Sequence, residues 1–449
     1  MAGSRLFGTD GVRGVANREL SVDLAVALGR AGATVLARRS GRRPRMLIGR
    51  DTRRSGDMLE AALAAGAMSV GADVLRLGIA TTPAVAYLVR VLDVDAGAVI
   101  SASHNPAPDN GIKFFSHDGY KLPDALEDEI AAIVTGGRET DRPDGAALGH
   151  AEDRQGELAR YVDFVAGLAG DLDGLRLVCD CANGAAATLA PAALRQAGAA
   201  VEALAASPDG MNINAGCGSL YPERLARAVV EQGAQAGFAF DGDADRVIAV
   251  DECGETVDGD QIMAMLGLDL LRRGELPGST VVGTVMSNLG LEVCLRRAGG
   301  RLQRTAVGDR YVLDAMQQGG YALGGEQSGH IVLLGHHTTG DGLLTAAMLS
   351  ALLRRSGEPL SELAAVMPRL PQVLQNVPVR GRVRLEEYPA IADAVRAAEG
   401  SLGDLGRVLV RPSGTEPLVR VMVQGGDEAA VRQAAARITQ VVAAEIGGV

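Results

Sequence analysis

Hydrophobic and polar positions fall into one pattern that occurs three times along the chain. Each copy begins with a short apolar run, passes through a polar turn into an alanine-rich segment, and ends in a glycine followed by a second apolar run. The copies occupy residues 45–78, 175–204 and 280–305. A strand, helix and strand in this order predict parallel pairing through a helical crossover. The pattern therefore predicts three similar α/β units.

The last part of the chain has a different pattern. Residues 407–411 and 417–423 alternate like neighbouring strands of an antiparallel sheet around a polar loop. Apolar side chains then recur at helical spacing from about residue 427 to residue 445. We interpret the proline-rich residues 367–371 as a linker. The predicted fold has α/β domains at residues 1–149, 150–252 and 253–368, and an α+β domain at residues 369–449.

Composition places the protein among ordinary globular chains. Of the 449 residues, 47% are hydrophobic and 22% are charged, and the net charge of −11 argues against a general nucleic-acid binder. Five scattered cysteines predict buried free thiols rather than a disulfide framework. No apolar leader is present at the start, and no uncharged run reaches the ~18 residues that span a bilayer. We therefore expect a cytoplasmic protein without membrane association.

Two lysines and two histidines stand out by position. Only Lys113 and Lys121 are lysines among 44 basic residues, which we interpret as a compositional bias toward arginine. Lys113 is therefore notable, since it follows closely after the serine-containing residues 101–106.

His336 and His337 have no ligand partner at metal spacing and are predicted to lie at the surface.

Three carboxylates stand close together between two apolar runs. Asp241, Asp243 and Asp245 would repel one another unless a cation lay among them, and Mg²⁺ is the first choice. An EF-hand calcium loop is excluded because Arg246 takes the position that requires glycine. Mg²⁺ prefers sites completed by phosphate oxygens, and Arg246 adds a cation suited to phosphate. The loop predicts a metal beside a phosphoryl ligand, with a solvated acidic turn as the alternative.

A short apolar run, residues 98–100, leads directly into the loop Ser101-Ala-Ser-His-Asn-Pro106. This pattern predicts a buried strand followed by a rigid loop that displays Ser103. A serine in this position is a nucleophile, a phosphate carrier or a turn residue. Because the three-aspartate loop predicts a phosphoryl ligand beside its metal, the role of phosphate carrier is favoured for Ser103.

Two further loops have the composition of anion sites. Residues 411–417 combine a glycine, two hydroxyls and Arg411, with Arg420 close behind, which is typical of a phosphate cradle or of a plain hairpin turn. Residues 7–14 form a glycine-rich loop that includes Arg13, able to approach an anion or to act as a structural turn.

Another glycine-flanked loop, residues 324–330, has the composition of a sugar site. Glu326 and Ser328 are two residues apart and can share one sugar through its hydroxyls, while His330 either donates to a sugar or phosphate oxygen or makes a local hydrogen bond. The chain has neither a G-x-S-x-G hydrolase elbow nor a Walker loop.

Taken together, these loops resemble those of the α-D-phosphohexomutase superfamily, in the same order and across the whole chain. The forms of residues 7–14 and 101–106 are most similar to the branch that acts on glucosamine phosphate, since hexose branches usually have threonine at Ser101. Ala244 departs from the glycine that is more common in the metal loop, and its small side chain should permit metal binding. The resemblance implies four domains around a central cleft.

The resemblance also implies roles for individual residues. Ser103 would carry a covalent phosphate and bind one Mg²⁺ together with Asp241, Asp243 and Asp245. Lys113 and His104 are the candidates for proton transfer, and Lys113 is favoured if cations such as Arg13 and the metal lower its pKa. The substrate would be held by Arg246, Glu326, Ser328, His330, Arg411, Ser413, Gly414, Thr415 and Arg420.

The implied reaction is the interconversion of glucosamine 6-phosphate and glucosamine 1-phosphate through a 1,6-bisphosphate, which would feed UDP-N-acetylglucosamine and cell-wall synthesis. A glucose or mannose phosphate mutase is the nearest alternative, followed by a metal-dependent phosphatase and a sugar-phosphate sensor. The expected partner is a small sugar phosphate, not nucleic acid. A kinase or bisphosphate donor would first phosphorylate Ser103, and a monomer or homodimer is expected.

Overall fold

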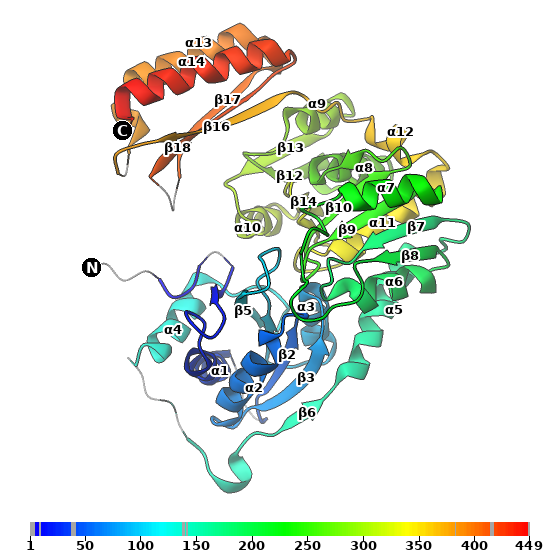
Figure 1. Cartoon of the computed structure of the whole chain (residues 1–449), viewed down its shortest axis with the longest axis vertical. Coiled ribbons are helices and arrows are strands. Elements are labelled where there is room, and N and C mark those ends of the chain that lie inside the picture. Colours follow the sequence, from blue (N-terminus) through cyan, green and yellow to red (C-terminus); the bar gives the residue numbers. More distant parts are fainter. Residues whose placement is uncertain are drawn as a thin grey trace.

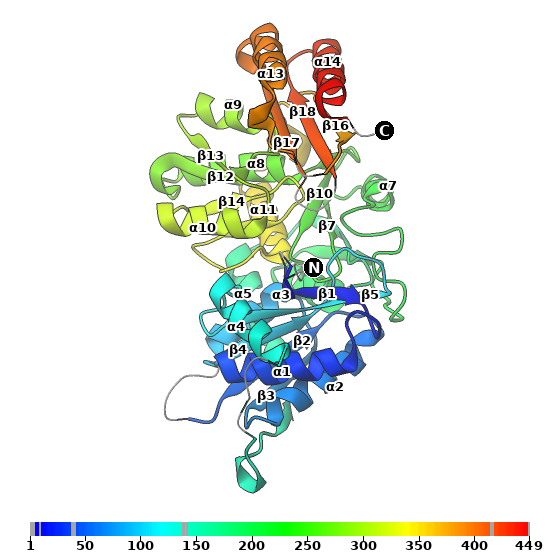
Figure 2. The ribbon, with the colours of Figure 1, turned by 90° about the vertical axis from the view of Figure 1, so that its left-hand side faces the viewer.

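The computed structural model describes residues 5–8, 10–36, 42–136, 140, 142–381, 383–413 and 417–447. Within these residues the longer strands form four sheets in chain order, of six, five, four and three strands. Figures 1 and 2 show the four parts following one another from the blue end of the chain to the red end. We refer to them as domains I to IV.

Domain I is built on a six-stranded sheet with the order β1-β5-β4-β2-β3-β6. Helices α1 and α2 pack closely against each other beside this sheet. The elements of domain I are β1 (Val12–Val15), α1 (Val22–Leu36), β2 (Arg45–Arg50), α2 (Ser55–Met68), β3 (Asp73–Ile79), α3 (Thr82–Val91), β4 (Ala96–Ile100), β5 (Asp109–Ser116), α4 (Asp124–Val134) and β6 (Ala151–Asp153).

Domains II and III repeat this design with fewer strands. Domain II contains α5 (Leu158–Ala169), β7 (Arg176–Asp180), α6 (Ala186–Gln196), β8 (Ala200–Leu204), α7 (Glu223–Gln232), β9 (Ala236–Phe240), β10 (Val247–Asp251) and β11 (Thr256–Val257). Domain III contains α8 (Gly259–Arg272), β12 (Thr280–Thr284), α9 (Leu289–Arg297), β13 (Arg301–Thr305), α10 (Asp309–Gly319), β14 (Leu323–Gly325), β15 (Ile331–Leu333), α11 (Gly342–Ser356) and α12 (Leu360–Ala364).

The three sheets share one arrangement of four strands. In each sheet the first two pairs are parallel and the last pair is antiparallel, in the orders β3-β2-β4-β5, β8-β7-β9-β10 and β13-β12-β14-β15. The predicted strand, helix and strand of each repeat correspond to the first parallel pair. The prediction of three similar mixed α/β units is confirmed.

Domain IV has a three-stranded antiparallel sheet, β16-β18-β17, covered on one face by two helices. Its elements are β16 (Gln372–Pro378), α13 (Pro389–Leu402), β17 (Arg407–Pro412), β18 (Leu418–Gln424) and α14 (Glu428–Ile446). The two predicted strands and the terminal helix are present. The third strand, β16, directly follows the proline-rich stretch and was not predicted.

Domains I to III share a hydrophobic core, whereas domain IV has its own. One continuous cluster of buried side chains includes residues from Leu47 to Met367 and so joins domains I, II and III. Domain IV has a separate cluster between its sheet and helices, from Val377 to Ile446. Domain IV is therefore attached to the rest of the molecule by fewer apolar contacts. In the described part of the chain, no helix has the length and apolar character needed to cross a membrane.

Candidate active site

The loops with candidate chemistry occupy the same place in each repeat. The serine loop joins β4 to β5, the three-aspartate loop joins β9 to β10, and the loop with Glu326 and Ser328 joins β14 to β15. In every case the loop follows a parallel strand and turns the chain into the antiparallel strand beside it. Equivalent edges of three sheets therefore supply the site.

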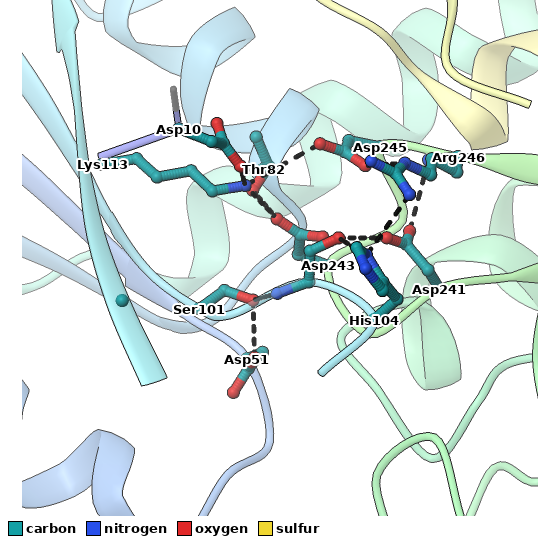
Figure 3. Close-up of polar contacts among 12 residues, drawn as sticks. Asp10, Asp51, Thr82, Ser101, His104, Lys113, Asp241, Asp243, Asp245 and Arg246 are labelled. Carbon is teal, nitrogen blue, oxygen red and sulfur yellow. Dashed lines mark hydrogen bonds and ion pairs between the residues drawn. The ribbon is translucent and has the colours of Figure 1, made fainter. Parts of the chain in front are cut away.

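Ser103 is buried and hydrogen-bonded on both sides. Its Oγ donates to Asp241 Oδ2 at 2.5 Å, and its backbone N–H donates to Ser101 Oγ at 2.9 Å. The Ser101 hydroxyl donates in turn to Asp51 Oδ2 at 2.6 Å (Figure 3). Ser103 has a φ of 53°, a left-handed conformation that non-glycine residues rarely adopt. The structure thus brings the predicted serine and the predicted metal loop into direct contact.

A buried arginine and an asparagine hold the serine loop by its backbone. The fully buried Arg53 pairs with Asp51 through Nε at 2.9 Å and donates from its terminal nitrogen to the carbonyls of Ser103 and Asn105 at 3.0 and 2.8 Å. Asn214 of domain II donates to the same carbonyls at 2.9 and 3.0 Å. Sequence reasoning missed these residues. The polar run Asp51-Thr-Arg53, at a strand end in the first repeat, was the available signal for Arg53.

The three aspartates form a buried carboxylate cluster. One carboxylate oxygen from each of Asp241, Asp243 and Asp245 lies within 4.8 Å of the others. Among the described residues, Asp243 Oδ1 and Asp245 Oδ1 are buried without a hydrogen-bond partner, which is costly for a carboxylate. Burial, followed by repulsion from Asp245 and Asp243, raises the pKa of Asp241 well above its usual value. Unpaired buried oxygens in such a cluster fit a divalent cation, as predicted.

Lys113 contacts this cluster from β5. Its Nζ lies 3.0 Å from Asp243 Oδ2, 3.8 Å from Asp245 Oδ2 and 2.9 Å from Asp10 Oδ2 (Figure 3). Burial alone would lower the pKa of Lys113, but these three carboxylates raise it above the usual value. This direction is opposite to the one required of a general base. A cation bound by the same aspartates would weaken their hold on the lysine and shift its pKa downward.

Asp243 has a further support from domain I. Thr82, the first residue of α3, donates its hydroxyl to Asp243 Oδ2 at 2.5 Å and its backbone N–H to the Asp243 carbonyl at 3.0 Å. Thr82 is fully buried. The metal loop of domain II is therefore held by domain I as well as by its own hairpin.

His104 and Arg246 lie on the other side of Ser103. His104 Nδ1 is 3.3 Å from Ser103 Oγ and 3.3 Å from a terminal nitrogen of Arg246. Burial, and then Arg246 and Arg13, lower the pKa of His104, which favours the neutral imidazole. Arg13 pairs with Asp10, next to Lys113. A neutral imidazole beside the serine hydroxyl can accept a proton or orient the hydroxyl.

The third loop is split between two environments. Glu326 accepts a hydrogen bond from the Gly308 backbone N–H at 3.0 Å and one from Ser328 Oγ at 3.3 Å. His330 is instead buried, with Nδ1 3.6 Å from Asp245 Oδ2 and Nε2 3.7 Å from Asp309 Oδ2. Burial alone would lower the pKa of His330, but Asp245 and Asp309 raise it. Glu326 and Ser328 thus share one face, and His330 faces the metal loop.

The loop of domain IV presents paired guanidinium groups. Arg411 and Arg420 lie directly opposite each other on β17 and β18. Burial and the neighbouring Arg420 lower the pKa of Arg411, whose Nε is buried without a hydrogen-bond partner. Two facing cations of this kind favour an anion between them. Ser413 donates its backbone N–H to the Leu418 carbonyl at 2.8 Å, and the predicted Gly414 and Thr415 lie outside the described residues.

A cavity of about 460 Å³ lies beside the carboxylate cluster. It is lined by the segment from β5 to α4 and by α10, and its charged side chains include Asp10, Lys113, Lys121, Asp309 and His330. Its volume is within the usual range for small-molecule sites.

The prediction for His337 is wrong, whereas His336 is exposed as expected. His337 is completely buried, donates from Nε2 to the Pro83 carbonyl at 2.9 Å, and accepts from the Thr338 N–H at 2.7 Å. Burial lowers its pKa to about 4. A neutral histidine can satisfy both ring nitrogens in a core, so its polarity did not require the surface. Four of the five cysteines are buried as predicted, and Cys253 is exposed.

Models of one protein family match almost the whole chain. They are described as phosphoglucomutase/phosphomannomutase α/β/α domain I at residues 4–141, domain II at residues 159–254 and domain III at residues 258–370, and as the C-terminal domain at residues 374–441. All four domain models occur once and in order.

Relatives and solved structures agree with these matches. A phosphoglucosamine mutase from Symbiobacterium thermophilum is 57% identical over 98% of this chain and 99% of its own length, and one from Saccharopolyspora erythraea is 56% identical over 98% and 99%. A phosphoglucomutase/phosphomannomutase family protein from Burkholderia thailandensis superimposes with a TM-score of 0.84 at 26% identity, covering all of both chains. An N-acetylphosphoglucosamine mutase from Aspergillus fumigatus shares the fold, with a TM-score of 0.68 at 17% identity over 97% of this chain and 95% of that one. The chain therefore belongs to the phosphoglucomutase/phosphomannomutase family, in which it stands with the relatives named phosphoglucosamine mutase.

Proposed function

We propose that this protein is a phosphoglucosamine mutase, which interconverts glucosamine 6-phosphate and glucosamine 1-phosphate with Ser103 as the phosphate carrier. The observation that carries the proposal is the 2.5 Å contact between Ser103 Oγ and Asp241 in the buried three-aspartate cluster. The whole-length identity to relatives named phosphoglucosamine mutase supports the choice of sugar.

The proposed reaction has two balanced transfers. In the first, O1 of glucosamine 6-phosphate bonds to the phosphoryl group of phospho-Ser103 and loses its proton, while the bond from phosphorus to Ser103 Oγ breaks and Oγ gains a proton. The resulting glucosamine 1,6-bisphosphate turns within the cleft. In the second, Ser103 Oγ loses its proton and takes the 6-phosphoryl group, and sugar O6 gains a proton. Glucosamine 1-phosphate is released. The transferring group passes through a loose, anionic transition state, so positioning and charge neutralisation dominate the catalysis.

Several charged side chains around Ser103 contribute to positioning and charge neutralisation. Asp241, Asp243 and Asp245 would hold Mg²⁺, which when bound neutralises charge on the transferring phosphoryl oxygens. Arg246, close to His104 and Ser103, adds a fixed positive charge on the other side. These groups are placed before substrate arrives, because each is already hydrogen-bonded or buried in the site.

Proton transfer is assigned to the groups nearest the reacting oxygens. The Nδ1 atom of His104 lies 3.3 Å from Ser103 Oγ, and its lowered pKa favours the neutral imidazole, so it suits the removal of the serine proton in the return step. Lys113 lies on the cleft side of the cluster, where its cationic ammonium group would donate a proton to the leaving sugar oxygen. A metal held by the aspartates would weaken their hold on that proton and would favour proton uptake by Lys113 from the sugar hydroxyl.

The remaining contacts hold the two ends of the substrate. Glu326 and Ser328 face one another and can bind neighbouring sugar hydroxyls. Arg411 and Arg420, with Ser413, Gly414 and Thr415, would bind the phosphate that does not react. His330, between Asp245 and Asp309, would donate toward a substrate oxygen in the adjoining cavity.

The proposal places the reaction in the cytoplasm, on the route to UDP-N-acetylglucosamine and cell-wall precursors. A kinase or a sugar bisphosphate would supply the first phosphate on Ser103, and bisphosphate would act as an activator. All of the proposed site residues come from one chain, so either a monomer or a homodimer satisfies the proposal.

The direct test is a comparison of substrates. With Mg²⁺ and a trace of sugar 1,6-bisphosphate, kcat/KM should be about tenfold or more higher for glucosamine 6-phosphate than for glucose or mannose 6-phosphate, since one net hydrogen bond contributes about 1.4 kcal/mol. Equal or higher kcat/KM for a hexose phosphate would retain the phosphoserine mechanism but contradict the assigned sugar. Net release of inorganic phosphate in place of isomerisation would indicate a phosphatase.

A further inference from the structure

The chain uses lysine at only two positions, and both lie in the same cluster. Lys113 and Lys121 are the only lysines among 44 basic residues. Arginine occupies every other basic position, on the surface and in the core alike. Lys113 already has a place in the proposed reaction, whereas Lys121 has none.

Both lysines bind one carboxylate. Lys121 Nζ lies 2.7 Å from Asp10 Oδ1, and Lys113 Nζ lies 2.9 Å from Asp10 Oδ2. Lys121 also pairs with Asp309 Oδ2. The side chains of Lys121, Asp10 and Asp309 are only about one-fifth exposed. Lys121 therefore fixes one oxygen of Asp10 while the other oxygen holds Lys113.

The size of the ammonium group explains the choice of lysine. A single ammonium nitrogen with three donors contacts both carboxylates from one point. A guanidinium reaches two carboxylates through separate nitrogens, as Arg42 does with Asp93 and Asp95. At Lys121 the two carboxylates come from separate domains, because Asp309 begins α10 of domain III and Asp10 precedes β1 of domain I. The compact ammonium group fits the point where these two oxygens converge.

The contacts link Lys121 to the reacting centre from the cleft wall. Lys121, Asp10 and Asp309 all line the 460 Å³ cavity beside the carboxylate cluster. On one side the chain of contacts runs through Asp10 to Lys113 and on to Asp243, as Figure 3 shows for these last three residues. On the other side Asp309 lies 3.7 Å from His330 Nε2.

We propose that Lys121 is a positioning residue for phosphoryl transfer: by bridging Asp10 and Asp309 across the cleft, it holds Lys113 at the carboxylate cluster. This inference rests on the proposed function of the same site. Without the ammonium group, Asp10 and Asp309 are two like charges facing each other. Repulsion between the two carboxylates would push Asp10 away, and Lys113 would lose its ion pair with Asp10.

Two variants of Lys121 and one control test the proposal. Lys121→Arg keeps the charge, so the protein should fold, but it changes the shape of the cation; Lys121→Met removes the charge. Arg42→Met is the control, since Arg42 also bridges two carboxylates, Asp93 Oδ2 at 3.1 Å and Asp95 Oδ1 at 3.3 Å, and is not among the residues that line the cavity. The measurements are kcat, KM, the thermal midpoint and the phosphate occupancy of Ser103 by intact mass.

The proposal predicts a loss in kcat with little change in KM or in phosphate occupancy. Lys121→Met should lose about 10²-fold in kcat, the cost of a small misplacement of a reacting group, and Lys121→Arg should recover little of it. Arg42→Met should keep wild-type kcat. Full activity of Lys121→Arg, or equal losses in Lys121→Met and Arg42→Met, would overturn the proposal.

The outcome is separable from the proposed function. The wild-type protein is first assayed with glucosamine, glucose and mannose phosphates, and the variants are then compared on whichever substrate it turns over best. Failure of glucosamine phosphate as a substrate contradicts the proposed function alone. An unchanged kcat in Lys121→Met on the best substrate contradicts the positioning role alone.

Discussion

Residues at the centre of the site are held in conformations that carry a cost. Ser103 and Ala244 have φ values of 53° and 56°, and left-handed backbone costs non-glycine residues ~1–2 kcal/mol each. Gly242 is equally constrained, since a Cβ there would lie 2.5 Å from the Ser103 carbonyl oxygen. The close approach of the metal loop to the serine loop therefore depends on these small residues.

Removal of one carboxylate from the cluster tests the metal assignment. Asp243→Asn should raise the Mg²⁺ concentration needed for half-maximal turnover by ~10–100-fold and lower kcat, because it removes a ligand charge and one anchor of Lys113. Asp251→Asn is the matched control, since Asp251 ends β10 of the same hairpin outside the cluster. A Mg²⁺ titration that is identical for Asp243→Asn and the wild-type protein would refute the assignment.

At this scale the sequence marks the charged groups that the structure brings together around Ser103, but not the residues that support them. Ser103 and the three aspartates are recognisable because several polar residues interrupt apolar strands. Arg53, Thr82 and Asn214 act through backbone carbonyls or a distant carboxylate, so no local pattern marks them. His337 was misplaced for a similar reason, because a carbonyl far along the chain satisfies it.

Among the elements, the repeat was predicted more completely than domain IV. The parallel strands of domains I to III are short, apolar and bounded by turn residues, so the sequence marks them clearly. The edge strand β16 alternates only weakly, with one buried residue, Val377, among half-exposed and exposed neighbours. Edge strands have one unpaired side and need less apolar surface, which leaves a weaker pattern.

The first turn of α11 carries a pH dependence of stability. Asp341 caps this helix by accepting from the Leu344 N–H at 2.9 Å, and it accepts from the Tyr161 hydroxyl. Burial raises the pKa of Asp341 to about 7. An acid whose pKa is raised on folding destabilises the fold as pH rises from about 4, and the penalty approaches ~4 kcal/mol above pH 7.

Asp341→Asn should therefore raise the thermal midpoint relative to the wild-type protein, by clearly more at pH 8 than at pH 5. Asparagine keeps the cap but cannot ionise. The control is Asp427→Asn in the exposed cap of α14, which should show no such difference between the two pH values. An equal change of the midpoint of Asp341→Asn at both pH values would contradict this account.

Across the whole molecule, domains I to III form one body and domain IV is attached through a few buried polar contacts. Gln424 of β18 is fully buried, accepts from the Leu289 N–H at 2.8 Å and donates to Gln372 Oε1 at 2.7 Å. Asn288 donates to the Leu370 carbonyl at 2.9 Å. Single side chains of this kind set the placement of domain IV. The sequence marks the four domains but not their relative placement, because such contacts follow no periodic pattern.

Loss of the Gln424 contact should loosen the phosphate-binding end of the site. We expect Gln424→Ala to raise KM for the sugar phosphate ~10-fold, as about 1.4 kcal/mol of hydrogen bonding is lost, and to leave kcat within about threefold. Gln375→Ala, on the neighbouring strand but away from domain III, is the control. A large fall in kcat with unchanged KM would show that domain IV acts on the chemical step.

The most direct test of the account follows phosphate on Ser103. Enzyme labelled with ³²P at Ser103 is mixed with one equivalent of glucosamine 6-phosphate and Mg²⁺, and the label is followed on protein and sugar. The account predicts transfer of label from protein to sugar at the rate of turnover, with no labelling or turnover in Ser103→Ala. Turnover by Ser103→Ala, or label that remains on the wild-type protein while product forms, would contradict it.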